Sequence, residues 1–508
     1  MTTEQETDRN RGTNERTAFT RRRFLVASGA VALGSLLAAC GDTVTAPTVG
    51  ALATTGAAVA TTAAPTGAAL ATTGAALATT AAPAVTAAVA TVGTTAMATT
   101  GTTAMVAAKP IKGTKLTILW QPASIPEAEA AMNKLMDDWA KQSGVELSKE
   151  VSSEYTSRLA TMAETKQGAD LVHLGAQDVA VNESVMMDVG DLAMEMGTKM
   201  GGYYDGPKSV AVRPDGKWKA VPALVYGQYW LYRQDLLKQA GLEKPPETWE
   251  ELHQLGKKTK AMDKPVGFVL GHAFTDGSTH TYSLMWDYGA KEFEADGKTL
   301  ALNSKEMMDC LTFFQTFYKD SCAENSFGWD EAGNNNAYNT GQIVATNNAN
   351  TIYVGLTKNN AALAMNSIHG STLKGPAGGF QYMAMLFWGI PTYSKNPDAA
   401  KAFLREAFYT PEFQTLFTKA GNGYNLPAFG LLDNVDGAWP TDPKLASART
   451  LAKTARMLGS PGPLTKVVGA SQNKFIIIDM FAKVAQGSSP KDAIAFAVNE
   501  YNVLLKGA

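Results

Sequence analysis

The sequence predicts an α/β fold, because segments with the patterns of strands and of helices alternate along the chain from Lys115 onward. Lys115–Trp120 is a short apolar segment typical of a buried strand, and Pro126–Gln142 carries apolar residues at helical spacing. Three further segments continue the alternation as strand, helix and strand: 145–151, 155–166 and 170–174. This order is typical of a parallel sheet covered by helices on both faces, in which ligands bind beyond the carboxyl ends of the strands.

The composition argues against several classes of function. The 508-residue chain has a formal net charge of −2, which is too weak to indicate nucleic acid as a partner. No group of cysteine and histidine residues has the spacing of a metal site, so we expect no metal and no cofactor. Cys310 lies in a predicted helix, so a disulfide with Cys322 would need a sharp turn after Lys319. Two unpaired thiols are the alternative.

Residues 1–40 have the pattern of an export signal. Thr20–Leu25 (TRRRFL) matches the twin-arginine export pattern, and the apolar run that follows is shorter than the roughly 20 residues of a membrane span. Leu37–Cys40 (LAAC) looks like a bacterial lipobox, in which Cys40 is lipidated once the signal is cleaved. We therefore expect an extracytoplasmic chain, in the periplasm or on the cell surface, that is anchored to the cell membrane through Cys40. An uncleaved membrane anchor is the alternative.

Residues 41–112 are rich in Ala and Thr, and no charged residue lies between Asp42 and Lys109. Such a segment has no large side chains to bury, so nothing offsets the entropy that ordering it would cost. We predict a disordered linker.

The segment Val221–Leu252 is the most specific in the chain. It combines a strand pattern rich in β-branched and aromatic residues up to Tyr232, a helix over Gln234–Ala240 that Gly241 ends, and a Pro-Pro break. Thr248, with a glutamate three residues later, then forms a capping box for the next helix. This run closely resembles the central signature of the family 1 extracellular solute-binding proteins, the maltose-binding group that serves ABC importers.

The resemblance implies an α/β fold of the two-lobed periplasmic-binding-protein class (type II), with a hinge of crossing strands near Leu224–Val225 and Phe387–Trp388. It places lobe 1 at 113–224 plus 388–435, and lobe 2 at 225–387 plus 436–508. Weaker matches to the family follow at Ala337–Gln342, Lys374–Pro376, Gly389–Pro391 and Leu426–Pro427.

Carried over position by position, the resemblance places aromatic, amide and hydroxyl side chains in a ligand cleft. Aromatic faces can cover the apolar face of a sugar ring, and amides or carboxylates can bind adjacent hydroxyl groups. The predicted ligand-binding residues are Trp120, Gln121, Gln177, Asp178, Tyr226, Gln228, Thr279, His280, Tyr282, Trp286, Trp329, Asn348, Asn350 and Trp388. Gln177–Asp178 could instead cap the next helix, and His280 could be a solvent-facing loop residue. We expect Asn334–Asn336 in a solvated turn, and Trp139 and Trp249 in the core.

The resemblance implies the solute-binding component of an ABC importer, which captures a carbohydrate, expected to be an oligosaccharide, by hinge closure between the lobes. The expected partners are that carbohydrate, the transmembrane subunits of the permease and the membrane, and the chain is expected to be a monomer. A same-fold receptor for a polyol phosphate or a peptide, and a ligand sensor for a membrane kinase, are the alternatives. We expect no enzyme, because a glycosidase needs two paired carboxylates and no sequence pattern pairs any here.

Overall fold

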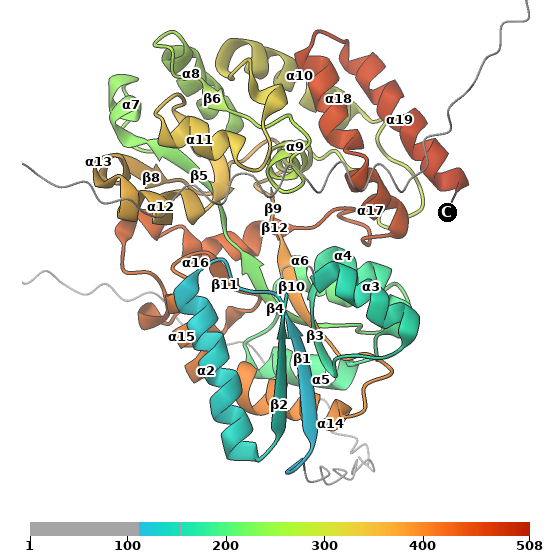
Figure 1. Cartoon of the computed structure of the whole chain (residues 1–508). Helices are drawn as coiled ribbons and strands as arrows, with labels where there is room; N and C mark the ends of the chain where they lie inside the picture. Colours follow the sequence, from blue (N-terminus) through green and yellow to red (C-terminus); the bar gives the residue numbers. More distant parts are fainter. Residues whose placement is uncertain (1–110, 153–154, 508) are drawn as a thin grey trace, which may run out of the picture. The chain divides into compact units, whose positions relative to one another are not determined.

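The structure is a computed structural model that describes residues 111–152 and 155–507 (Figure 1). These residues belong to one compact unit, Gly101–Ala508. The predicted signal and nearly all of the predicted linker lie outside the described residues. The described residues form a six-stranded, a four-stranded and a two-stranded sheet. We call the part around the six-stranded sheet lobe 1 and the part around the four-stranded sheet lobe 2.

The sheet of lobe 1 has the strand order β11-β4-β10-β3-β1-β2. Its strands are β1 (Lys115–Trp120), β2 (Glu146–Val151), β3 (Leu171–Gly175), β4 (Val221–Tyr226), β10 (Met385–Gly389) and β11 (Asn425–Pro427). β1 is parallel to β2 and to β3, as the alternating pattern predicts. The expectation of an all-parallel sheet is wrong, because β10 is antiparallel to β3 and β4 and β11 is antiparallel to β4. Both strands return from a distant part of the chain, which a local alternation pattern does not record.

The strands of lobe 1 are joined by helices whose ends follow local signals. Pro126 opens α2, and Gly144 ends it in the left-handed region with φ 70°. The buried side chains of α2, among them Met132 and Trp139, face the core, as predicted for Trp139. The helices of lobe 1 are α2 (Pro126–Ser143), α3 (Tyr155–Thr165), α4 (Ala176–Val181), α5 (Gly190–Lys199), α6 (Asp205–Ala211), α14 (Pro397–Phe403) and α15 (Pro411–Ala420).

The sheet of lobe 2 has the strand order β6-β7-β5-β8, in which β5 is antiparallel to β7 and β8 and β6 is parallel to β7. Its strands are β5 (Gln228–Arg233), β6 (Val266–Gly267), β7 (Ala345–Ala349) and β8 (Ser367–His369). The helices of lobe 2 are α7 (Gln234–Gln239), α8 (Trp249–Lys260), α9 (Asp276–Asp287), α10 (Lys305–Ser321), α11 (Gly333–Asn339), α12 (Thr351–Asn359), α13 (Ala361–Met365), α17 (Lys466–Asn473), α18 (Ile476–Ala485) and α19 (Pro490–Lys506). Figure 1 shows the C-terminal helices α18 and α19 beside α10, far along the sequence but in the same lobe.

The start of lobe 2 confirms the helix signals of the central segment. Gly241 follows α7 with φ +80°, and Thr248 Oγ1 accepts a hydrogen bond from the Glu251 N–H at 3.1 Å. Trp249 is buried in the core, as predicted. The prediction of one continuous strand to Tyr232 is wrong, since the chain breaks between β4 and β5 at Gly227.

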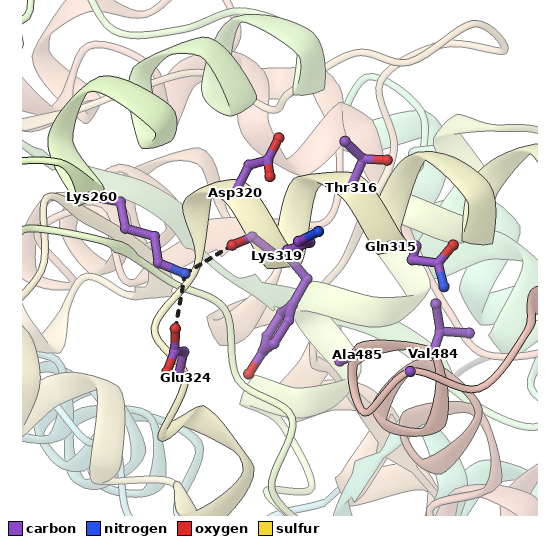
Figure 2. Close-up of a pocket in the computed structure, with 10 residues that line it drawn as sticks. Lys260, Gln315, Thr316, Lys319, Asp320, Glu324, Val484 and Ala485 are labelled. Carbon is purple, nitrogen blue, oxygen red and sulfur yellow. Dashed lines mark hydrogen bonds and ion pairs between the residues drawn. The ribbon is translucent and has the colours of Figure 1, made fainter.

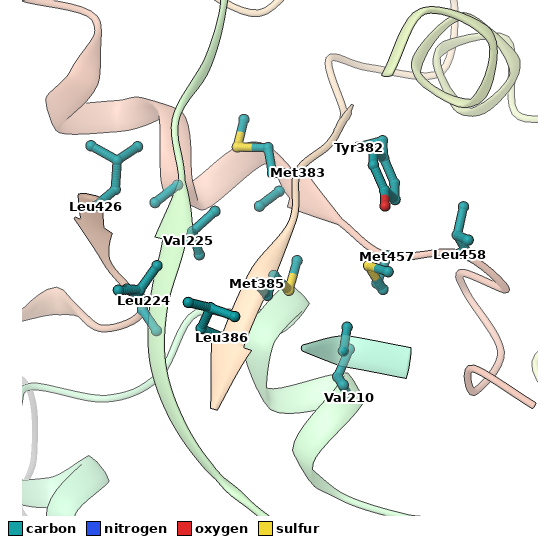
Figure 3. Close-up of a cluster of buried hydrophobic side chains, with 14 of the residues drawn as sticks. Val210, Leu224, Val225, Tyr382, Met383, Met385, Leu386, Leu426, Met457 and Leu458 are labelled. Atoms are coloured by element: carbon teal, nitrogen blue, oxygen red, sulfur yellow. The ribbon is translucent and has the colours of Figure 1, made fainter. Parts of the chain in front are cut away.

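The chain passes between the lobes at Gly227, again at Met383–Ala384, between β9 (Gln381–Tyr382) and β10, and a third time between β11 and α17. The hinge positions predicted near Leu224–Val225 and Phe387–Trp388 lie in β4 and β10, the strands of lobe 1 that adjoin the first two crossings, and they stay a prediction. Figure 3 shows the buried apolar cluster at these crossings, in which Val225, Met385 and Met457 are labelled. β9 pairs with β12 (Ala455–Arg456), which follows the short helix α16 (Ala448–Leu451). The crossings are therefore anchored by apolar packing.

Two further expectations are settled by the interior of lobe 2. Cys310 and Cys322 are both buried and unpaired, so the alternative of two free thiols is correct. The expectation of a solvated turn at Asn334–Asn336 is wrong, because these residues lie in α11 and Asn334 is buried, with its amide near Thr346 Oγ1 at 3.3 Å. Within residues 111–152 and 155–507, no helix combines the length and the apolar character that crossing a membrane requires.

Candidate functional site

The two lobes are joined by polar contacts. The side-chain amide of Gln177, in α4, donates a hydrogen bond to the side-chain oxygen of Gln472, in α17. Two further contacts reach from lobe 2 to the loop before β11 in lobe 1. Asn350 Nδ2 donates to the Asn422 carbonyl at 2.6 Å, and the Tyr229 hydroxyl donates to the Gly423 carbonyl at 2.5 Å. We use the term interlobe surface for the side chains that make these contacts, Gln177, Gln472, Asn350 and Tyr229, together with the side chains of both lobes that surround them.

Lobe 1 brings tyrosines and a carboxylate to the interlobe surface. Tyr226, the last residue of β4, has its ring centroid 4.7 Å from that of Tyr424, whose hydroxyl is 3.2 Å from Ser124 Oγ. Tyr155 forms a hydrogen bond with Asp178 in α4. Four of these five residues lie at or beyond the carboxyl end of a strand, after β1, β2 and β3 and at the end of β4. This is the edge at which α/β sheets bind ligands.

The protonation of these groups follows from their burial. Burial raises the pKa of Tyr226, Tyr424 and Tyr155, so the three phenols keep their protons and can donate hydrogen bonds. Burial also raises the pKa of Asp178, while hydrogen bonds from the Gly175 N–H and from Tyr155 lower it. Asp178 Oδ2 accepts from the Gly175 N–H at 2.9 Å, so it also caps α4, as the alternative explanation expected.

Lobe 2 brings a layer of amide side chains to the same region. Gln381 Nε2 donates to the Gln228 carbonyl at 2.7 Å and lies 3.4 Å from Asn347 Oδ1. Asn348 Nδ2 donates to Asp276 Oδ2 at 2.9 Å. All five residues are buried, and burial raises the pKa of Asp276 well above its usual range. None of the residues named on either side is a lysine or an arginine, so the region suits a neutral ligand rather than an anion.

Several amide atoms in this region are left without partners. Gln228 Oε1, Asn350 Oδ1 and both amide atoms of Asn425 are buried and have no hydrogen-bond partner among the described residues. Leaving such a group unsatisfied costs about 1–3 kcal/mol. Each of these groups is within one or two residues of a contact between the lobes or of a crossing strand. Hydroxyl groups of a ligand could satisfy them.

Other predicted site residues lie inside the lobe 1 core or at its edge. The Trp120 ring stacks on His173, with centroids 4.3 Å apart, and His173 contacts Trp388 at 5.1 Å. Trp120 Nε1 donates to Glu129 at 2.9 Å. Trp388 is fully buried, and this apolar packing explains its burial. Gln121 lies directly after β1 and is half-buried. A ligand role for these residues stays a prediction.

The predicted residues Thr279, His280, Tyr282 and Trp286 all lie in α9, which is buried along its whole length. The expectation of a solvent-facing loop at His280 is wrong, because its Nδ1 lies 2.8 Å from the carbonyl one turn earlier in the helix. Burial lowers the pKa of His280 to about 4, so its ring is neutral. A ligand role for these four residues likewise stays a prediction.

Trp329 lines a different pocket, of about 570 Å³, on the outer part of lobe 2. It shares Lys260 and Glu324 with a neighbouring pocket of about 530 Å³ that Figure 2 shows. Lys260 Nζ donates to the Lys319 carbonyl at 2.9 Å and lies 3.6 Å from Glu324. No residue lining these two pockets is among the described residues with an unpartnered buried polar atom. The interlobe surface is therefore the better candidate site.

Sequence reasoning missed several residues of this region, among them Gln381, Tyr424, Asn425 and Gln472. None of them belongs to a local motif that indicates ligand binding. They reach the site because β9, β11 and α17 return to the interlobe surface from distant parts of the chain. Only a signal for tertiary proximity could have identified them.

Comparison with known proteins decides the family. Residues 122–414, more than half of the chain, match the family described as bacterial extracellular solute-binding protein. The chain belongs to this family. The resemblance found in the central segment is thereby confirmed.

A curated relative of this solute-binding protein matches over a shorter segment. YcjN of Escherichia coli strain K12, described as an ABC transporter periplasmic-binding protein, is 34% identical over 121 residues, which are 23% of this chain and 27% of that protein. The chain thus spans about a quarter of the length of the first curated relatives it matches.

Solved structures match over most of the chain and confirm the two-lobed fold. The maltose-bound MalE3 of T. maritima has a TM-score of 0.60 at 19% identity, over 77% of this chain and 100% of that one. A solute-binding protein from Agrobacterium radiobacter K84, in complex with ribitol, has a TM-score of 0.57 at 19% identity, over 78% of this chain and 100% of that one. At this identity the likeness concerns the fold alone.

Proposed function

We propose that this protein is the non-enzymatic solute-binding component of an ABC importer, and that it binds a neutral carbohydrate between its two lobes. The family is one of extracellular solute-binding proteins, and the matching relative is described as part of an ABC transporter. The ligand class rests on the interlobe surface, and the single observation that carries it is the group of unpartnered buried amides at Gln228, Asn350 and Asn425.

The chemistry of the interlobe surface supports a polyhydroxylated ligand. Tyr226 and Tyr424 present adjacent aromatic rings, which suit the apolar face of a sugar. Amides offer a donor and an acceptor side by side, which suits adjacent hydroxyl groups. A sugar phosphate would call for lysine or arginine near the ligand. The binding residues in this proposal are Gln177, Asp178, Tyr226, Gln228, Asn348, Asn350, Tyr424 and Asn425.

Binding and transport are coupled by the hinge in this proposal. The ligand touches both lobes only when they are closed, so it favours the closed form through its differential affinity for that form. The permease subunits recognise the closed form.

The chain reaches the cell surface or periplasm as a twin-arginine lipoprotein held by Cys40. Cys40→Ala should therefore move the protein from the membrane fraction to the soluble fraction.

The proposal is tested by thermal unfolding of the purified protein with sugars, polyols, sugar phosphates and peptides. A ligand at a hundredfold excess over its Kd adds about 2.7 kcal/mol to the free energy of unfolding, which raises the Tm. We expect a neutral sugar to raise it, and Tyr226→Ala or Tyr424→Ala to weaken binding at least tenfold. Tyr393→Ala, a half-buried tyrosine of lobe 1 outside the interlobe surface, is the control. A rise only with sugar phosphates or peptides would overturn the carbohydrate assignment.

A further inference from the structure

Glu292 is a carboxylate in the interior of lobe 2, in the loop between α9 and α10, and it is fully buried. Its Oε2 accepts a hydrogen bond from the Gly459 N–H at 3.0 Å. Its Oε1 accepts hydrogen bonds from the hydroxyls of Tyr501 and Tyr282, the latter at 3.2 Å, and lies 3.3 Å from Ser471 Oγ. We call these five residues the Glu292 cluster.

The cluster ties the loop of Glu292 to four other parts of the chain. Tyr282 lies in α9, Ser471 in α17 and Tyr501 in α19, while Gly459 lies in the third crossing, between β11 and α17. Burial raises the pKa of Tyr282 and of Tyr501, so both phenols keep their protons and donate to the carboxylate. Burial also raises the pKa of Glu292, and the hydrogen bonds from its partners oppose this rise. A buried carboxylate with this many directed hydrogen bonds fixes the segments around it in one arrangement.

Two helices of the cluster also hold the interlobe contact of Gln472. Ser471 directly precedes Gln472 in α17, and successive residues of a helix point about 100° apart. The helix therefore presents Ser471 to the Glu292 cluster and Gln472 to the interlobe surface. Gln472 Nε2 lies 3.1 Å from Ser278 Oγ, which is one turn before Tyr282 in α9. The placement of α17 against α9 thus sets where Gln472 meets Gln177 of lobe 1.

We propose that Glu292 is a positioning residue for ligand binding, which fixes α17 against α9 so that Gln472 meets Gln177 when the lobes close. This inference rests on the proposed function and adds to it a residue outside the interlobe surface. None of the four partners of Glu292 named above is among the residues proposed to bind the ligand, so its effect passes through α17. The ligand favours the closed form, and a closed form without the bond between the two glutamines has a higher free energy.

Glu292→Gln tests the carboxylate with little change in side-chain volume. A carboxylate accepts hydrogen bonds on both oxygens, whereas an amide accepts on one atom and donates from the other. In the variant an NH2 group therefore faces either the Gly459 N–H or the hydroxyl groups, and the cluster loosens.

Asp170→Asn is the matched control. Asp170 is a buried carboxylate of lobe 1 that accepts from the Ser394 hydroxyl at 2.9 Å and from the Thr117 N–H at 3.1 Å. It directly precedes β3, so it lies at the amino end of that strand, opposite to the edge that carries the interlobe surface.

The experiment is a double-mutant cycle between Glu292→Gln and Gln177→Ala. Because α4 belongs to lobe 1, hydrogen–deuterium exchange of its backbone amides reports loss of the interlobe contact rather than loosening around Glu292. We expect Glu292→Gln to speed exchange in α4 by about 2- to 13-fold, the range for loss of one hydrogen bond. In the Gln177→Ala background it should add less than about twofold.

Ligand binding should follow the same pattern. The probes are glucose, galactose, mannose, xylose and their 1,4-linked disaccharides, and the Kd of each sugar that binds is measured by isothermal titration. Glu292→Gln should raise this Kd in the wild-type background and leave it unchanged in the Gln177→Ala background. Asp170→Asn should lower the free energy of unfolding in urea and leave both the exchange of α4 and the Kd unchanged.

Tyr501→Phe keeps the ring and removes one hydroxyl of the cluster, so it serves as a second variant where Glu292→Gln does not fold, and it should act in the same direction. Faster exchange in α17 with unchanged exchange in α4 would show that Glu292 only stabilises lobe 2, and would overturn the inference. Equal effects of Glu292→Gln in both backgrounds would overturn it as well. A wild type that binds none of these sugars would overturn the proposed function, and with it the role of Glu292 in ligand binding.

Discussion

The bond between Gln177 and Gln472 allows a direct test of how the lobes are held together. Gln177→Ala removes this contact between the lobes, and alanine near the start of α4 does not weaken the helix. A hydrogen bond contributes about 0.5–1.5 kcal/mol net, so the equilibrium between open and closed forms should shift toward the open form by about 2- to 13-fold.

The shift can be measured without a ligand. Hydrogen–deuterium exchange of backbone amides in α4 and α17 should become faster by the same factor, because local opening exposes them more often. With a bound sugar, the Kd should rise by at least that factor, since only the closed form makes the bond and Gln177 is itself one of the proposed binding residues. Gln254→Ala is the control, since Gln254 bonds only a glutamate one turn away on the exposed face of α8, at 2.7 Å. Unchanged exchange in both helices would refute the idea that this bond holds the lobes together.

Three further predictions concern stability. His173 is buried in a cluster with Trp120 and Trp388, and burial lowers its pKa to about 3 from an unfolded value of about 6.5. It therefore adds stability at neutral pH that is lost as the pH falls through this window. His173→Phe should remove that loss. In urea unfolding from pH 7 to pH 4, the free energy of unfolding of the wild type should fall relative to that of the variant by up to about 1.4 kcal/mol per pH unit. Parallel pH dependences of the two proteins would contradict this prediction. Gly227→Ala should lower the free energy of unfolding, measured in urea, by about 1–3 kcal/mol, because its Cβ would lie 2.4 Å from the Gly423 carbonyl oxygen. An unchanged free energy of unfolding would show that the backbone at this crossing shifts to make room for the added methyl group. Burial raises the pKa of both the Cys310 and Cys322 thiols, so a thiol reagent should modify them only after unfolding, in a Cys40→Ser background; fast labelling of the native protein would disprove it.

Local signals in the sequence predicted many elements correctly. The strand Lys115–Trp120 has the predicted bounds, and α2 begins at Pro126 as predicted. Gly241 and Thr248 end and begin helices as their chemistry requires. These features depend on backbone geometry and on hydrogen bonds between near neighbours, which the sequence records directly.

The family, and with it the two-lobed fold, was likewise accessible from the sequence of the central segment. The burial of His280, the antiparallel placement of β10 and the break at Gly227 were not. Each depends on packing against residues far away in the chain.

What the sequence by itself determined is the family and the alternation of strands and helices. It also predicted Gln177, Tyr226 and Asn350, which we propose as part of the binding site. Only the tertiary structure decided which side chains meet: Gln472 reaches Gln177 because α17 packs beside α4. It also decided which amides are left without a partner among the described residues. The physical reason is that a binding surface between two lobes is assembled from segments whose separation in sequence carries no local pattern.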